Sequence, residues 1–245
     1  MSHWYSLDGT LHTQVANASK GGMRDTTMKD ARKHGWLPSV TTVLQLLNRP
    51  GLNEWRVRQA AWHGMLYGQQ MVQFPDTSYI KDVVAEADKV VEAAADFGTD
   101  FHAAVAHWLG GRDYIGRLDT MSILEGFIEW YNNHDIQCLM AECSFASEEY
   151  GYAGTIDFIG TWNDRPVLVD FKTQEGPATF YDEYPLQLVA YSLGIGEPDL
   201  TRISVVVDRV TPGRISVHEY PDNEGDARKW LAVWECWKEM HSWNK

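Results

Sequence analysis

The sequence predicts an α+β fold, in which a largely helical first half precedes a central mixed β-sheet flanked by helices. Apolar residues recur every three or four positions over Tyr79–Leu109 and Thr120–Asn133, which is the period of an amphipathic helix. From residue 137 onward, short apolar or alternating runs are typical of strands. We expect a single domain over 1–245, with a helical portion over 1–135 and a β-β-β-α-β-β-α core over 136–245.

The polar N-terminal segment over residues 1–36, called the lead-in below, is expected to be irregular apart from a short helix over Thr26–Lys33. A helix capped by Ser39 or Thr41 follows and stops at Pro50, because Ser and Thr side chains accept hydrogen bonds from the free N–H groups of a first turn. A second helix is expected over Leu52–Met65. The long helix over Tyr79–Leu109 contains Gly98 as a candidate break and ends at Gly110-Gly111.

Five strands and two helices are predicted for the second half. The first three strands are expected at Gln137–Ala146, Ala153–Trp162 and Arg165–Thr173. A helix over 183–194 separates them from a hairpin of Arg202–Val210 and Arg214–Tyr220, and an amphipathic helix over Asp222–His241 closes the chain.

Asn163-Asp164 predicts a two-residue hairpin turn between the second and third strands, because both residues tolerate positive φ. In that register Asp157 lies opposite Asp170, and Thr155 lies opposite Lys172. Residues two apart share one face of a strand. Asp157, Asp170 and Lys172 are therefore expected on one face, with the other face formed by Ile156, Phe158, Val169 and Phe171.

Two opposed carboxylates about 4 Å apart repel by on the order of 4 kcal/mol at an effective dielectric of 20. Lys172 can compensate as an ordinary cross-strand salt bridge, or a divalent cation such as Mg²⁺ can lie between the oxygens. The pair by itself leaves both readings open, including a small α+β domain with a salt-bridged hairpin and no activity.

The order of several short motifs resembles the RecB-like branch of the PD-(D/E)XK nuclease superfamily. The motifs are Gly98-x-x-x-His102, an acid on a first strand, Gly154-x-x-Asp157, Asp170-x-Lys172 and Gln187-x-x-x-Tyr191. LPSVTTVL from residue 37 and RPGLNEW from residue 49 also resemble the N-terminal part of phage-type and mitochondrial single-strand exonucleases of this branch. Together the matches span about residues 37 to 191.

The resemblance implies a restriction-endonuclease-like fold and a metal-dependent deoxyribonuclease, most similar to exonucleases that act on single-stranded DNA or DNA ends. It places Asp157, Asp170 and His102 as metal ligands, Lys172 beside the attacking water, and Gln187 and Tyr191 next to the site. Glu142 is our choice for the first-strand acid and fourth metal ligand, with Glu148 and Glu149 as competitors near a turn.

The expected cofactor is Mg²⁺ or Mn²⁺. Cys138, Cys143 and Cys236 are too few and too scattered for the four-cysteine iron–sulfur cluster of some relatives, and we expect them to be small core residues. No G-x-x-x-x-G-K-[ST] occurs, so neither ATP nor a helicase is expected in this chain. The sequence departs from the superfamily name because Ile156, not proline, precedes Asp157.

The formal charge is −13, but the first 58 residues carry a net +4. This region is the expected DNA-binding part, with Ser39, Thr41, Thr42 and Arg56 as phosphate contacts. No apolar run approaches a membrane span, so we expect an intracellular, cytoplasmic protein without membrane contact, phage-encoded in a bacterial host. Recombination or replication proteins are the expected partners.

Two alternatives keep the same fold. One is a structure-specific or restriction-like endonuclease on duplex DNA, and the other is a catalytically silent nucleic-acid-binding module. In the favoured reading, the helical first half covers the sheet and limits entry to single strands or frayed ends.

Overall fold

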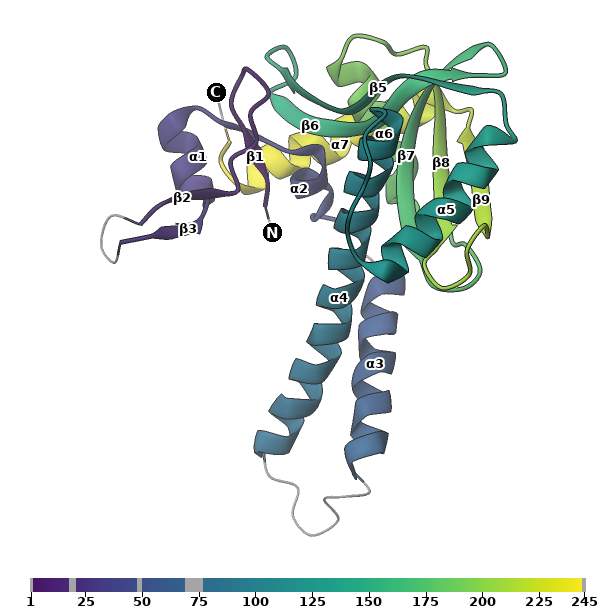
Figure 1. Ribbon diagram of the computed structural model, residues 1–245. Coiled ribbons are helices and arrows are strands. Elements are labelled where there is room, and N and C mark those ends of the chain that lie inside the picture. Colours follow the sequence, from purple (N-terminus) through teal and green to yellow (C-terminus); the bar gives the residue numbers. More distant parts are fainter. Residues whose placement is uncertain (1, 18–20, 48–49, 69–76, 244–245) are drawn as a thin grey trace.

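The structure, a computed structural model, describes residues 2–17, 21–47, 50–68 and 77–243. Arg49, which begins the RPGLNEW motif, lies outside the described residues. Within them the chain forms seven helices (Figure 1): α1 (Met28–His34), α2 (Val40–Leu44), α3 (Pro50–Gly68), α4 (Thr77–Leu109), α5 (Leu118–Asn132), α6 (Glu183–Gly194) and α7 (Asn223–Met240). The strands are β1 (Trp4–Tyr5), β2 (Gln14–Ala16), β3 (Met23–Asp25), β4 (Leu37–Pro38), β5 (Ile136–Ser147), β6 (Tyr152–Trp162), β7 (Arg165–Gln174), β8 (Thr201–Asp208) and β9 (Ile215–Tyr220).

The main sheet is mixed, with strand order β5-β6-β7-β8-β9. Strands β7 and β8 pair in parallel and are joined through helix α6, whereas the other neighbouring strands are antiparallel. A parallel pair needs a crossover connection, and the apolar helix between the third and fourth predicted strands supplies it. The expected combination of helices with a mixed sheet is confirmed.

Helices cover both faces of this sheet. Helices α2, α6 and α7 bury one face, in a cluster that includes Val43, Leu188 and Trp230. Helices α4 and α5 bury the other face through residues such as Phe101 and Phe127. Burial on both sides explains the nearly continuous apolar character of β7 and β8.

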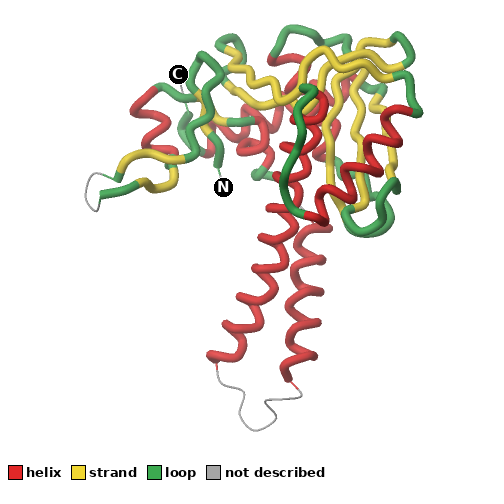
Figure 2. The backbone as a smooth tube through the Cα atoms, viewed as in Figure 1, coloured by secondary structure: helices red, strands yellow, loops and turns green. Residues whose placement is uncertain are grey.

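Helices α3 and α4 form an antiparallel hairpin that projects from the body of the molecule (Figures 1 and 2). The 33 residues of α4 span about 50 Å at 1.5 Å per residue. Its last turns, with Phe101 and Val105, pack on the sheet, while Arg56 of α3 and Asp88 of α4 form an ion pair within the hairpin. In the described chain, no helix combines the length and apolarity needed to cross a bilayer.

The first half differs from expectation in three ways. The lead-in contains two short antiparallel pairs, β1 with β4 and β2 with β3, so it is not simply irregular. Helix α2 is capped by Ser39 as predicted but ends at Leu44, well before Pro50. Gly98 does not interrupt α4; a Cβ there would lie 3.3 Å from Thr173 Oγ1, so the glycine lets α4 approach β7 closely.

Candidate metal centre

The β6–β7 hairpin sets the position of the acidic residues. Asn163 and Asp164 have φ of 50° and 61°, as the predicted turn requires, and the strands pair from Trp162 with Arg165 to Phe158 with Val169. Beyond that pair the ladder ends, and the expected pairing of Asp157 with Asp170 is not formed. The two strands separate at the acidic residues.

The side chain of Asp157 takes the place of a backbone hydrogen-bond acceptor between β6 and β7. Its Oδ2 accepts a hydrogen bond of 2.7 Å from the backbone N–H of Phe171. Ile156 and Phe158 were expected on one face, but they pack in opposite core clusters, so strand alternation is interrupted at Asp157. This interruption lets Asp157 reach His102 on α4, with Oδ1 3.2 Å from Nδ1.

Three side chains from three elements converge here. One ligand atom from each of His102 on α4, Glu142 on β5 and Asp157 on β6 lies within 4.8 Å of the other two. The Oε1 of Glu142 is 4.0 Å from Nδ1 of His102. These are three of the four predicted metal ligands; Asp170, the fourth, is not a member of this group.

Glu142 has an unusual backbone for a strand residue. Its φ is +50°, in the left-handed region that a non-glycine residue adopts at a cost of order 1 kcal/mol or more. Its neighbours Ala141 and Cys143 both pair with β6, and a second irregularity of β5 lies nearby, where the register shifts between Cys138 and Met140. Glu148 and Glu149, the competing candidates, lie in the turn after β5 and are not among the three converging residues.

Asp170 belongs to an adjacent hydrogen-bonded network. Its Oδ1 accepts from Lys172 Nζ at 2.9 Å and from Gln187 Nε2 at 2.8 Å. Oδ2 lies 2.7 Å from Lys172 Nζ, yet it is buried without a well-directed hydrogen bond. Gln187 also accepts from Lys172 at 3.1 Å and donates to the hydroxyl of Tyr191 at 2.9 Å. The network therefore holds the Asp170-x-Lys172 and Gln187-x-x-x-Tyr191 side chains together.

Charge and burial shift the pKa values of this region. Burial lowers the pKa of His102, but the charge and hydrogen bond of Asp157, together with the charge of Asp170, outweigh burial and raise the pKa to about 9. Burial raises the pKa of Asp157, but His102 and Lys172 outweigh that effect and lower it overall. Burial, and then the charge of Asp157, raise the pKa of Glu142. Burial raises the pKa of Asp170 to about 6 against the opposing charge of Lys172.

The donor set fits a hard divalent cation. Two carboxylates and one imidazole face one another, and carboxylate oxygens are the ligands that Mg²⁺ and Mn²⁺ prefer. The imidazole of His102 lies against Asp157, and a metal held through Nδ1 would require that nitrogen to be unprotonated. The residues that would hold the ion are His102, Glu142 and Asp157.

Gly154 explains how Tyr191 fits against β6. A Cβ at this position would lie 2.8 Å from Cε1 of Tyr191 and 3.1 Å from Cε1 of Phe145. The glycine therefore makes room for the buried Tyr191 ring.

The predicted DNA-contacting residues are not equally available. Ser39 and Thr42 are buried, and Thr42 N–H donates to Ser39 Oγ at 2.9 Å in the cap of α2. Their proposed phosphate contacts conflict with this burial, because both hydroxyls are used within the fold. Thr41 is half-buried and Arg56 is exposed.

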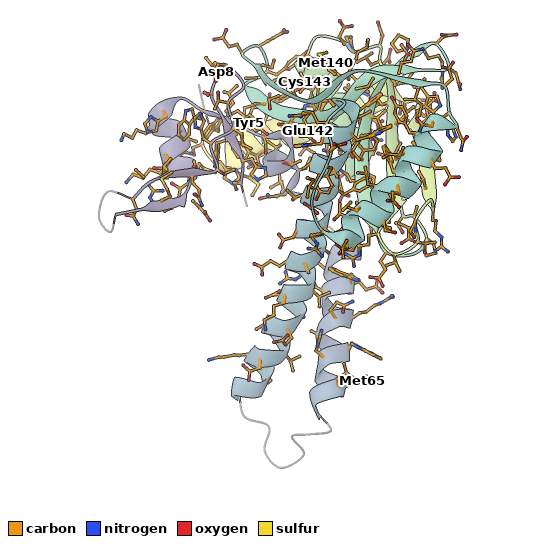
Figure 3. All side chains as sticks on the ribbon, viewed as in Figure 1. Tyr5, Asp8, Met65, Met140, Glu142 and Cys143 are labelled. Atoms are coloured by element: carbon orange, nitrogen blue, oxygen red, sulfur yellow. The ribbon has the colours of Figure 1, made fainter. Side chains whose placement is uncertain are left out.

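Several residues near the centre were not predicted as site residues. Tyr5 Oη and Thr155 Oγ1 are 3.0 Å apart, and Thr155 Oγ1 lies 2.9 Å from Ser144 Oγ. Tyr5 is close enough to Glu142 for that carboxylate to raise its pKa, after the larger effect of burial (Figure 3). Thr155 lies two residues from Asp157, which is a local signal, but no pattern in the sequence links Tyr5 to this site.

The cysteines only partly match the expectation of small core residues. All three are free thiols; Cys138 is half-buried and packs against the core cluster under α4 and α5, Cys143 is half-buried, and Cys236 is exposed.

Comparisons with known proteins add little. No family model matches the sequence, and no curated protein matches it. Among solved structures, one similar chain is described as "Crystal structure of SSO0001"; it is 16% identical, with a TM-score of 0.31, covering 73% of this chain and 68% of that chain. Similarity at this score carries no argument about fold or function.

Proposed function

We propose that this protein is a metal-dependent deoxyribonuclease with a restriction-endonuclease-like fold, of the RecB-like branch of the PD-(D/E)XK superfamily. The observation that supports it most is the convergence of His102, Glu142 and Asp157 from three elements. The Asp170–Lys172 pair lies beside them, on the strand that diverges from Asp157. An ordinary salt-bridged hairpin accounts for Lys172 and Asp170 but not for this convergence.

The chain's residues have distinct roles in this proposal. A divalent cation held by His102, Glu142 and Asp157 would supply positive charge to the phosphate oxygens as cleavage proceeds. The backbone N–H of Phe171 fixes one oxygen of Asp157 and leaves the other directed toward His102. Glu142, whose backbone is left-handed, brings its Oε1 to 4.0 Å from Nδ1 of His102.

Lys172 acts as a fixed positive charge next to the attacked phosphate. Its ammonium donates to Asp170 and Gln187, which leaves one N–H for a water or a phosphate oxygen. The ammonium also lies 5.3 Å from the ring centroid of Tyr184, a further contact that limits its movement.

Cleavage of labelled linear DNA tests the proposal. We expect activity with Mg²⁺ or Mn²⁺, none with EDTA, and a loss of at least about a hundredfold in Asp157→Asn and Lys172→Met. Asp164→Asn is the matched control, because Asp164 lies in the turn of the same hairpin and outside the cluster. Activity that survives EDTA, or equal activity of the two aspartate variants, contradicts the proposal.

A closed circular substrate separates an exonuclease from an endonuclease. We expect degradation of linear single strands and of DNA ends, with closed single-stranded circles resistant. Cleavage of circles at the linear rate assigns the site to an endonuclease, while binding without cleavage by the unaltered chain indicates a silent module.

A further inference from the structure

The N-terminal lead-in packs directly against the strand that carries Asp157. Tyr5 of β1 pairs with Leu37 of β4, and Ser39, which follows β4, forms a parallel bridge to Ala153 of β6. Tyr5, Leu37 and Ala153 are almost completely buried and pack together as a small core cluster of their own. The lead-in is therefore fixed to β6 close to the candidate metal centre.

A chain of three hydroxyl groups links the lead-in to two strands of the centre. The hydroxyls of Tyr5 and of Thr155 on β6 are hydrogen-bonded, with Oη 3.0 Å from Oγ1. Thr155 Oγ1 is hydrogen-bonded in turn to Oγ of Ser144 on β5, with the two oxygens 2.9 Å apart. Tyr5 is only 3% exposed, so its hydroxyl depends on this hydrogen bond rather than on bulk water. The chain joins three segments that are far apart in the sequence.

The three hydroxyls lie next to two of the candidate metal ligands. In the register of β5 with β6, Ser144 pairs with Thr155, and Glu142 falls opposite Asp157 two residues further along each strand. Burial raises the pKa of Tyr5 most, the hydrogen bond to Thr155 lowers it, and the charge of Glu142 raises it further. The hydroxyl of Tyr5 is therefore within electrostatic range of the Glu142 carboxylate.

The strand that carries Glu142 is weakly secured at this point. The β5–β6 ladder skips Glu142, whose φ is +50°, and the register of β5 shifts again between Cys138 and Met140. A left-handed residue other than glycine persists only where its surroundings hold it in place. Strand β5 is also an edge strand of the main sheet, so its position depends on β6. The hydrogen bond between Ser144 and Thr155 fastens the two strands directly beside this irregular position.

We propose that Tyr5 is a positioning residue of the metal centre, which acts through Thr155 to hold Glu142 opposite Asp157. Its hydroxyl orients Thr155 for the hydrogen bond to Ser144, and that bond fixes β5 against β6 beside the two carboxylates. Residues that orient metal ligands without touching the ion typically change metal affinity by about 10- to 100-fold. This inference rests on the metal centre of the proposed function, and it gives the lead-in a role other than contact with DNA.

Binding of Mn²⁺ to the full chain without DNA, measured by calorimetry, tests this proposal. Tyr5→Phe keeps the buried ring and removes only its hydroxyl, and Thr155→Val replaces the central hydroxyl of the chain by a methyl group of similar size. We expect each variant to bind Mn²⁺ about tenfold more weakly than the unaltered chain. Because both substitutions break the same chain of hydroxyls, the double variant should bind no more weakly than Thr155→Val alone.

Two further variants separate positioning from general disturbance of the sheet. Thr155→Ser retains the oxygen that contacts Tyr5 and Ser144, so it should bind Mn²⁺ like the unaltered chain. Tyr152→Phe is the matched control, because it removes a buried tyrosine hydroxyl from the same strand, one that donates to the Ala190 carbonyl at 3.0 Å. This control should keep the Mn²⁺ affinity of the unaltered chain even where denaturant titration shows a lower free energy of unfolding.

The measurement also distinguishes this inference from the proposed function. Weaker Mn²⁺ binding by Tyr5→Phe, combined with no DNA cleavage by the unaltered chain, keeps the positioning role and rejects the nuclease. Unchanged Mn²⁺ affinity in Tyr5→Phe, an equal loss in Tyr152→Phe, or additive losses in the double variant overturns the positioning role and leaves the nuclease standing. No saturable binding of Mn²⁺ by the unaltered chain overturns both.

Discussion

At the scale of the residue, Gln187 connects more of the candidate centre than any acid does. One amide contacts Asp170, Lys172 and Tyr191, so a single side chain orients the acid and the ammonium relative to each other. Misplacing a reacting group by about 1 Å costs on the order of a hundredfold in rate.

Gln187→Leu preserves the approximate size of the side chain but removes all three hydrogen bonds. If the proposed function holds, we expect kcat to fall by about a hundredfold with KM little changed, because Gln187 positions other groups. The steady-state rate on labelled DNA measures this. Gln137→Leu, an exposed glutamine on β5, is the control; an equal loss there would assign the effect to general disturbance of the chain.

A second prediction at this scale concerns Asp208 and pH. Burial raises the pKa of Asp208, but the N–H groups of the following turn, including that of Val210 at 2.9 Å, lower it below its usual value. A carboxyl whose folded pKa is depressed stabilises the fold above its unfolded pKa and loses that contribution as pH falls through the folded value. Asp208→Asn should therefore reduce the free energy of unfolding near about pH 7, and the difference should shrink toward about pH 3. Denaturant unfolding at several pH values measures it, and a constant difference would contradict the assignment.

At the scale of the element, the β6–β7 hairpin shows that a turn sequence predicts the pairing of the residues near the turn but not the pairing at the far end of the strands. Asn163-Asp164 predicts the turn correctly, and the register holds for five pairs from Trp162 to Phe158. It fails at Asp157, where a side chain replaces the backbone partner. Turn chemistry controls the pairs next to it, whereas the far end of the hairpin depends on helices α4 and α6.

Gly154→Ala tests the packing of α6 against β6. The added Cβ would meet the rings of Tyr191 and Phe145, so we expect a loss of about 1 to 3 kcal/mol in the free energy of unfolding. The displaced Tyr191 should also lower the activity of the proposed nuclease. Gly64→Ala is the control, since a Cβ there lies 3.9 Å from Val83 and alanine favours a helix by about 1 kcal/mol over glycine. Thermal unfolding of both variants would show opposite shifts.

At the scale of the whole molecule, Arg202 joins four elements. The fully buried guanidinium on β8 donates to the Pro185 carbonyl of α6, the Tyr220 carbonyl of β9 and the side chains of Asn223 and Asp226 of α7. Removing one partner of a buried ion pair leaves an uncompensated charge, at a typical cost of about 3 to 5 kcal/mol.

Arg202→Met should therefore lower the free energy of unfolding by about 3 to 5 kcal/mol, measured by denaturant titration. Arg165→Met removes an exposed ion pair with Glu219 in the same sheet and should leave stability close to that of the unaltered chain. Equal losses of unfolding free energy in the two variants would show that the burial of Arg202 does not determine its contribution to stability.

The sequence by itself determined the order of helices and strands of the main sheet and the turn at Asn163-Asp164, because periodicity and turn chemistry are local properties. The choice of the acids, the lysine and the histidine came from the order of short motifs that resembles a nuclease family, and their roles stay predictions. Only the tertiary structure decided that His102, Glu142 and Asp157 meet while Asp170 joins Lys172 and Gln187. It also decided that Tyr5 approaches Glu142 and that Ser39 and Thr42 are buried. These arrangements arise from packing between segments that are distant in the chain, and a local pattern carries no information about such contacts.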